Sequence, residues 1–154
     1  MGVRFALVAW FAIGLGGSSL GAQTAQQLQR MLDSNQAFAL RDAVARGHAP
    51  AFYRGAVEES ENRLKAAKRE LDRAIAANPH GKEAFEAHEM LSNAHFRDGQ
   101  FRESLAEAEA AHRVEPDSAD LNNTLPLLRV LAEAADMAVV ERRSSRIEIK
   151  RDRN

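Results

Sequence analysis

Apolar residues recur every three or four positions through most of the chain, which is the period of an amphipathic helix. Most glycines and prolines stand between such segments rather than inside them, but Gly55 and Pro126 stand inside. Pro126 either kinks a helix within 119–135 or stands in the first turn of one that starts near Asn123. The pattern predicts an all-α fold. Its expected helices cover 24–32, 35–46, 50–60, 61–77, 82–97 and 100–114.

A shift of 37 residues superimposes the helix at 61–77 on the helix at 100–114. A large residue, mostly small ones and a closing proline recur in register. Small residues let a neighbouring helix approach closely, so this spacing predicts tight antiparallel hairpins. Such repetition is typical of a stacked helical-hairpin array. The matching pairs are Leu64 and Phe101, Ala67 and Ser104, Leu71 and Ala108, Ala74 and Ala111, and Pro79 and Pro116.

The segment 85–118 carries the residues of a known repeat in order. Its helices are separated by the turn Asp98-Gly99-Gln100-Phe101, and Pro116 closes it. It resembles a tetratricopeptide repeat, and 48–81 resembles a preceding one. The resemblance implies antiparallel hairpins stacked as a short solenoid. The other matching residues are Leu91, Ala94, His95, Phe96, Ser104, Ala108 and Ala111 in the later repeat, and Gly55, Ala67, Ala74 and Asn78-Pro79 in the earlier one.

The sequence departs from the family pattern in three respects. The spacing of 37 exceeds the usual 34 or so residues, Ser92 and His95 replace the more typical Gly and Tyr, and the earlier repeat lacks the glycine-aromatic turn. We expect a helical domain that contains two repeats and part of a third. Its expected bounds are 23–135 for the domain, 48–81 and 82–118 for the repeats, and 119–135 for the partial repeat.

The first residues have the three-part pattern of a secretory signal peptide. Arg4 supplies the positive charge, the stretch 5–17 is uncharged and apolar, and small residues follow as far as Ala22. We expect a signal peptide at 1–22, cleaved after Ala22 or Gly21, and export to the periplasm or the cell exterior. The apolar stretch is too short to span a bilayer comfortably as a permanent anchor. We expect no stable membrane span once it has been cleaved off. The alternative is an uncleaved N-terminal anchor.

The spacing of apolar residues changes from the helical period to alternation in the tail, 136–154. Met137-Ala138-Val139-Val140 is rich in β-branched residues, and polar and apolar residues alternate over 146–150. This predicts a short, basic, β-type tail. A signal peptide, helical repeats and basic strands in this order are similar to the N-terminal part of bacterial secreted retropepsin-like aspartic proteases. The resemblance implies a β catalytic domain in cis beyond residue 154, because the chain has no Asp-Thr/Ser-Gly motif.

Candidate catalytic and metal motifs are incomplete. Asp117-Ser118-Ala119 is the nearest match to an aspartic-protease triplet. It directly follows Pro116, where Asp and Ser are typical residues of a turn and a helix N-cap. His88-Glu89 begins like a zinc-peptidase helix, but Ser92 occupies the position of the second His. His95 lies two turns from His88, and its approach to His112 more often means a packed pair than a metal site. We therefore expect no catalytic, cofactor or metal site.

Composition narrows the function further. The chain has 21 basic and 22 acidic residues and a net charge of -1, which gives no support to nucleic-acid binding. The absence of cysteine excludes thiolate nucleophiles and disulfides. A protein-interaction module that holds a protein or peptide on its concave face is the first hypothesis. Its candidate partner-binding residues are Phe52, Ala56, Glu59, Glu89, Asn93, Phe96 and Arg97.

Two other hypotheses remain open. One is the protease accessory region described above. The other is a structural cap or an oligomer, because two repeats are fewer than the three or more that usually make such arrays stable, and burial by a neighbour would compensate.

Overall fold

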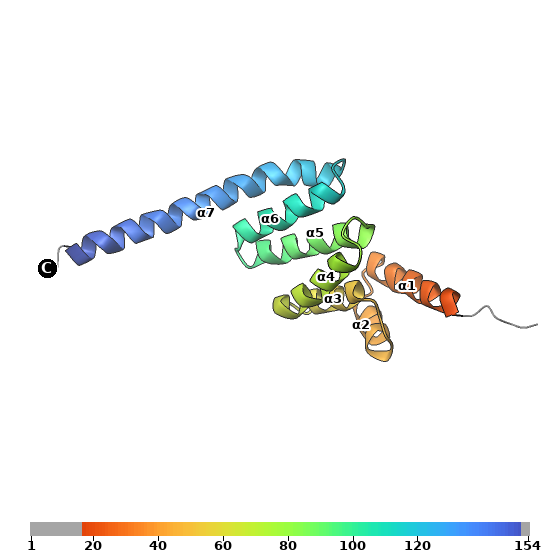
Figure 1. The fold of residues 1–154 in the computed structure, drawn as a ribbon. Helices are drawn as coiled ribbons and strands as arrows, with labels where there is room; N and C mark the ends of the chain where they lie inside the picture. Colours follow the sequence, from red (N-terminus) through yellow and green to blue (C-terminus); the bar gives the residue numbers. More distant parts are fainter. Residues whose placement is uncertain (1–16, 152–154) are drawn as a thin grey trace, which may run out of the picture.

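The computed structural model describes the backbone of residues 17–151 and the side chains of residues 25–142. In this part of the chain all regular structure is α-helical, which confirms the expected all-α character (Figure 1). Most of the expected signal peptide, residues 1–16, and the last residues, 152–154, lie outside it. The helices are α1 (Gly17–Asp33), α2 (Ala37–Arg46), α3 (Ala51–Ser60), α4 (Leu64–Ala77), α5 (Lys82–Arg97), α6 (Phe101–Val114) and α7 (Ala119–Arg151).

Three helix pairs, α1–α2, α3–α4 and α5–α6, are each joined by the same short turn. One residue in each turn has a left-handed backbone: Asn35 (φ 53°), Asn62 (φ 59°) and Gly99 (φ 71°). Glycine and asparagine are the residues that adopt this conformation at least cost. The next amide bonds back five residues: Gln36 to Met31, Arg63 to Glu58 and Gln100 to His95, each at 2.9 Å. These turns explain why α2 and α4 begin later than the sequence pattern suggested.

The 37-residue spacing extends from single residues to whole elements. Helices α4 and α6 are both 14 residues long, and they begin at Leu64 and Phe101. Helices α5 and α7 begin at Lys82 and Ala119, which is the same interval. The turns that precede them also match, because Gly81 bonds to the carbonyl of Asn78 as Ser118 bonds to that of Glu115. The architecture is compatible with a helical repeat.

Close helix contact depends on small residues, as the sequence predicted. At Gly55 on α3, an added Cβ would lie 2.6 Å from the side chain of Leu71 on α4. The positions 37 residues later are Ser92 on α5 and Ala108 on α6, so a small–large pair becomes a small–small pair. Ser92 then donates its hydroxyl to the carbonyl of Ser104, at 2.9 Å. The described residues form two hydrophobic core clusters. The larger one contains the buried residues Leu28, Leu40, Ala49, Phe52, Tyr53, Val57, Ala67, Leu71, Ala74, Ala87 and Leu91.

The prediction of a β-type tail at 136–154 is wrong for residues 136–151, which continue α7. A strand needs a neighbouring strand, and the described part of the chain contains none. Extending an existing helix costs little once it is nucleated, and no glycine or proline stands between Leu127 and Arg151. Pro126 lies inside α7, so it does not stand in the first turn of a new helix near Asn123.

Candidate functional site

Two residues of the predicted partner-binding face are part of the core. Phe52 and Ala56 are both buried in α3. The ring of Phe52 packs edge-on against that of Tyr53, with centroids 5.2 Å apart. The side chain of Phe52 belongs to the larger hydrophobic core, whereas Ala56 lines a small groove together with Glu59 and residues of α1 and α2.

Glu59 and Arg97 are brought together from the last turns of α3 and α5. They form an ion pair between residues 38 positions apart in the chain. This pair joins two helices whose residues were predicted to lie on the same concave face. Each of these charges therefore has a partner within the chain, and Glu59 also lines the small groove beside Ala56. Phe96 is partly exposed beside it and packs edge-on against Phe101, at 5.5 Å between centroids.

Glu89 and Asn93 line a groove between α5 and α7. Asp120 and Thr124 form its opposite wall, and the groove has a volume of about 230 Å³. We call these four residues, with Ser92, Ala108 and Leu121 at the base, the acidic groove. Sequence analysis missed Asp120 and Thr124. The signal was present, because the 37-residue shift makes the first turns of α7 equivalent to those of α5.

The acidic groove has a concentrated negative charge. Burial raises the pKa of Glu89 above its ordinary value, and the neighbouring carboxylates of Asp120, Glu115 and Glu86 raise it further. Lys82 pairs with Glu86 at 2.9 Å. Within the described residues, Glu89 and Asp120 have no ion pair with a basic side chain. The groove therefore favours a ligand that brings a positive charge.

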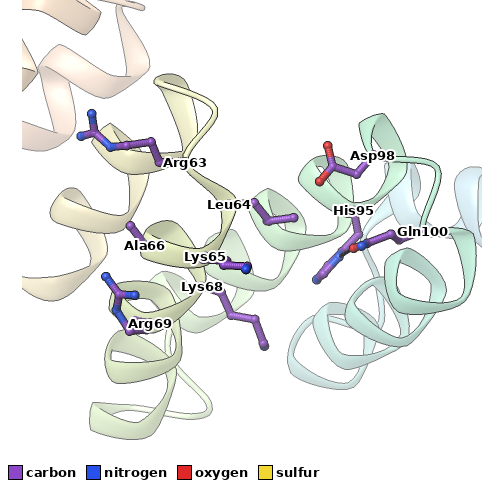
Figure 2. Close-up of a pocket in the computed structure, with 9 residues that line it drawn as sticks. All are labelled: Arg63, Leu64, Lys65, Ala66, Lys68, Arg69, His95, Asp98 and Gln100. Atoms are coloured by element: carbon purple, nitrogen blue, oxygen red, sulfur yellow. Dashed lines mark hydrogen bonds between the residues drawn. The ribbon is translucent and has the colours of Figure 1, made fainter.

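A second groove lies between the start of α4 and the α5–α6 turn, with a volume of about 590 Å³. Figure 2 shows that Lys65, Lys68 and His95 point toward this space, whereas Arg63 and Arg69 extend away from it. The sequence indicated only the apolar stripe of α4, and the cations at its start were not predicted as site residues. The lining residues of this basic groove are Arg63, Leu64, Lys65, Ala66, Lys68, Arg69, His95, Asp98 and Gln100.

Two of the four cations at the basic groove are paired with carboxylates. Arg63 forms ion pairs with Glu58 and Glu61. Lys68 pairs with Asp72 at 3.1 Å and with Glu107 at 3.5 Å. The ring of His95 shares a 2.6 Å hydrogen bond with Gln100. The groove lies at a seam between hairpins, and the ion pair of Lys68 on α4 with Glu107 on α6 crosses this seam.

The histidines have separate environments. His88 binds Glu107 at 2.8 Å, His95 binds Gln100, and the Nδ1 of His112 is buried without a hydrogen-bond partner. Among the described residues no group of three or more His, Cys, Asp or Glu side chains is placed to hold a metal ion. Asp117 and Ser118 lie in the turn before α7, and the Ser118 hydroxyl accepts the amide of Leu121 at 3.4 Å, as expected for a cap.

No described helix combines the length and the apolar character needed to cross a membrane. A search of protein-family models found none that matches the chain, and a search of curated proteins found no match either.

Proposed function

We propose that this protein is an exported protein-interaction module of the tetratricopeptide type, with no catalytic site of its own. The observation that carries the proposal is one hairpin geometry that recurs at a spacing of 37 residues. This recurrence makes α5 and α7 equivalent first helices of successive hairpins. Stacked hairpins of this kind bind extended or helical segments of other proteins between their first helices.

The chemistry of the acidic groove selects the partner. Glu89 and Asp120 can accept charge-assisted hydrogen bonds, and Asn93 and Thr124 can donate or accept neutral ones. A Lys or Arg side chain of a partner segment satisfies both carboxylates and removes their mutual repulsion. The proposed ligand is therefore a protein segment with a basic residue at its centre.

Binding to an array of short random-sequence peptides tests the proposal. Bound peptides should be enriched in Lys or Arg, and Glu89→Gln should weaken them about tenfold, which corresponds to the loss of one charge-assisted hydrogen bond. Asn93→Ala should weaken binding with little effect on stability, because its side chain is exposed.

Glu103→Gln is the matched control, since Glu103 is an exposed carboxylate on α6 outside both grooves. It should bind peptides as the unmodified protein does. If no basic enrichment occurs, or if Glu103→Gln and Glu89→Gln weaken binding equally, the acidic groove is not the binding site.

Export is the second part of the proposal and rests on the pattern of residues 1–22. The intact mass of the protein recovered from its source should correspond to a chain that begins at Gln23 or Ala22, found outside the cytoplasm. A chain that retains residues 1–22 in the cytoplasm would contradict it.

The protease-accessory alternative depended largely on strands in the tail. Since residues 136–151 are helical, the observation that favoured it is gone. We therefore keep the interaction module as the single proposed function.

A further inference from the structure

Helix α7 continues past the helices against which it packs. Asp136 pairs with Arg102, the second residue of α6. Residue 136 of α7 therefore lies beside the start of α6, and the remaining turns extend beyond the hairpins. Figure 1 shows this blue part of α7 projecting from the body of the protein.

An apolar stripe lies on α7 opposite the face that packs on α6. The packed face contains Leu121, Leu125 and Leu128. The stripe is solvent-exposed: Leu127 by 57%, Val130 by 61%, Met137 by 72% and Val140 by 63%. Ala134 lies between them. Spacings of three and four place these residues on one side of a helix, with Glu133 and Glu141 among them. A largely apolar surface therefore faces water.

The stripe is not a feature of the repeat. The positions 37 residues earlier, on α5, are Met90, Asn93 and Arg97 in place of Leu127, Val130 and Ala134. Two of these three are polar. The apolar surface is therefore specific to α7 and requires an explanation of its own.

The stripe is self-complementary in an antiparallel arrangement. Leu127 and Val140 are equally distant from a midpoint between residues 133 and 134, and so are Val130 and Met137. When two copies of α7 cross there in opposite directions, Val130 of one copy meets Met137 of the other. Ala134 is small and stands near the crossing point, where the helices approach most closely.

The charge along α7 favours the same direction. Between residues 119 and 136 of α7 there are three acidic residues and one basic, whereas between 137 and 151 there are five basic residues and two acidic. Antiparallel pairing places the basic end of one helix along the acidic end of the other, and parallel pairing opposes like charges. Asp120 stands at the start of α7, with Glu115 and Asp117 in the turn before it, and the basic residues stand at the other end: Arg142, Arg143, Arg146, Lys150 and Arg151.

We propose that the stripe Leu127, Val130, Ala134, Met137 and Val140 is a dimerisation surface whose partner is α7 of a second copy of this chain, running antiparallel. A two-fold interface of this kind uses the same patch on both subunits. The inference goes beyond the proposed function, because the dimer needs no peptide in the acidic groove.

Sedimentation velocity over a range of concentrations tests the proposal on the purified protein. The protein should be a dimer, and Val130→Asp with Met137→Asp should be monomeric with an unchanged helical circular dichroism signal. Phe38→Asp is the matched control, because Phe38 is an equally exposed apolar residue (76%) on α2. It should remain dimeric. A monomeric unmodified protein, or a dimer that survives both α7 substitutions, would overturn the inference.

Disulfide trapping tests the direction of the helices. The chain has no cysteine, so single cysteines can be added without side reactions. A mixture of Val130→Cys and Met137→Cys subunits should oxidise mainly to mixed Val130→Cys–Met137→Cys dimers, since disulfides require close Cα atoms. Predominant like-with-like cross-linking would indicate parallel helices and contradict the proposal. Peptide binding measured on the same variants tests the proposed function separately.

Discussion

Asn62 and Gly99, 37 residues apart, have the same left-handed backbone conformation, with φ of 59° and 71°. Each is followed by the first residues of an equivalent helix, α4 or α6. The earlier turn was expected to differ, because it lacks glycine. Asparagine replaces glycine there since its short polar side chain tolerates this conformation. The hairpins are therefore equivalent in backbone geometry where their sequences differ.

Gly99→Ala should lower the free energy of unfolding by about 1 kcal/mol. The cost comes from the backbone alone, because no atom lies within 4 Å of an added Cβ. Gly99→Asn should cost less, as Asn62 indicates. Urea unfolding measures both changes. Gly47→Ala is the control, since Gly47 has a φ of -139° and an open environment. Equal losses for Gly99→Ala and Gly99→Asn would contradict the role of the left-handed turn.

Gly55→Ala should destabilise the protein by about 1–3 kcal/mol, the usual cost of overpacking a core. The added methyl group would meet Leu71 at 2.6 Å, where α3 and α4 cross. In a double-mutant cycle with Leu71→Ala, measured by urea unfolding, the two losses should sum to more than the loss of the double variant. Additive losses would mean that the two positions do not touch.

Glu107→Gln should cost about 1–2 kcal/mol at neutral pH, because Glu107 joins three helices. Burial alone would raise the pKa of Glu107, but the hydrogen bond from His88 and the charge of Lys68 lower it overall. A lowered folded-state pKa gives stability that is present above the unfolded-state pKa of about 4.3 and is lost as pH falls through the folded-state pKa.

Urea unfolding of the unmodified protein and of Glu107→Gln at several pH values measures this contribution. The difference between them should be constant near neutral pH and should shrink as the pH falls below about 4. A difference that does not change with pH would show that the carboxylate charge is not the source of the stability.

Glu89→Gln should have the opposite effect and raise stability slightly at pH 7, by less than about 1 kcal/mol. Burial and nearby carboxylates raise the pKa of Glu89, so its ionised form costs stability above the folded-state pKa. The cost disappears as pH falls below the unfolded-state pKa, and the gain from the substitution disappears with it. Thermal unfolding as a function of pH measures this. A loss of stability at pH 7 would mean that Glu89 has a stabilising partner.

Sequence periodicity located the helices because it reports one local quantity, the side of a helix on which apolar residues fall. The glycine and proline breaks placed the ends of α3, α5 and α6 within a residue or so of the structure. The 37-residue shift, which came from single residues, extends to the equivalent starts of α5 and α7. These features depend on neighbours in the chain, and the sequence contains them.

Tertiary structure decided which predicted residues face solvent. Phe52 and Ala56 share a helical face with Glu59 in the sequence, but packing buries the first two, while Glu59 pairs with Arg97 on another helix. The walls of the acidic groove come from α5 and α7, so Asp120 joined Glu89 only when both helices were placed against α6.

The tail shows the same division between local and long-range information. The alternation over 146–150 is a local pattern that suits a strand, but a strand exists only with a partner, and a helix satisfies its own backbone hydrogen bonds. With α7 already formed through residue 135, continuing the helix is the cheaper outcome for residues 136–151. The helices and the 37-residue recurrence follow from the sequence alone, because their signals are local. The groove, the buried face and the form of the tail depend on tertiary contacts, because each involves residues far apart in the chain.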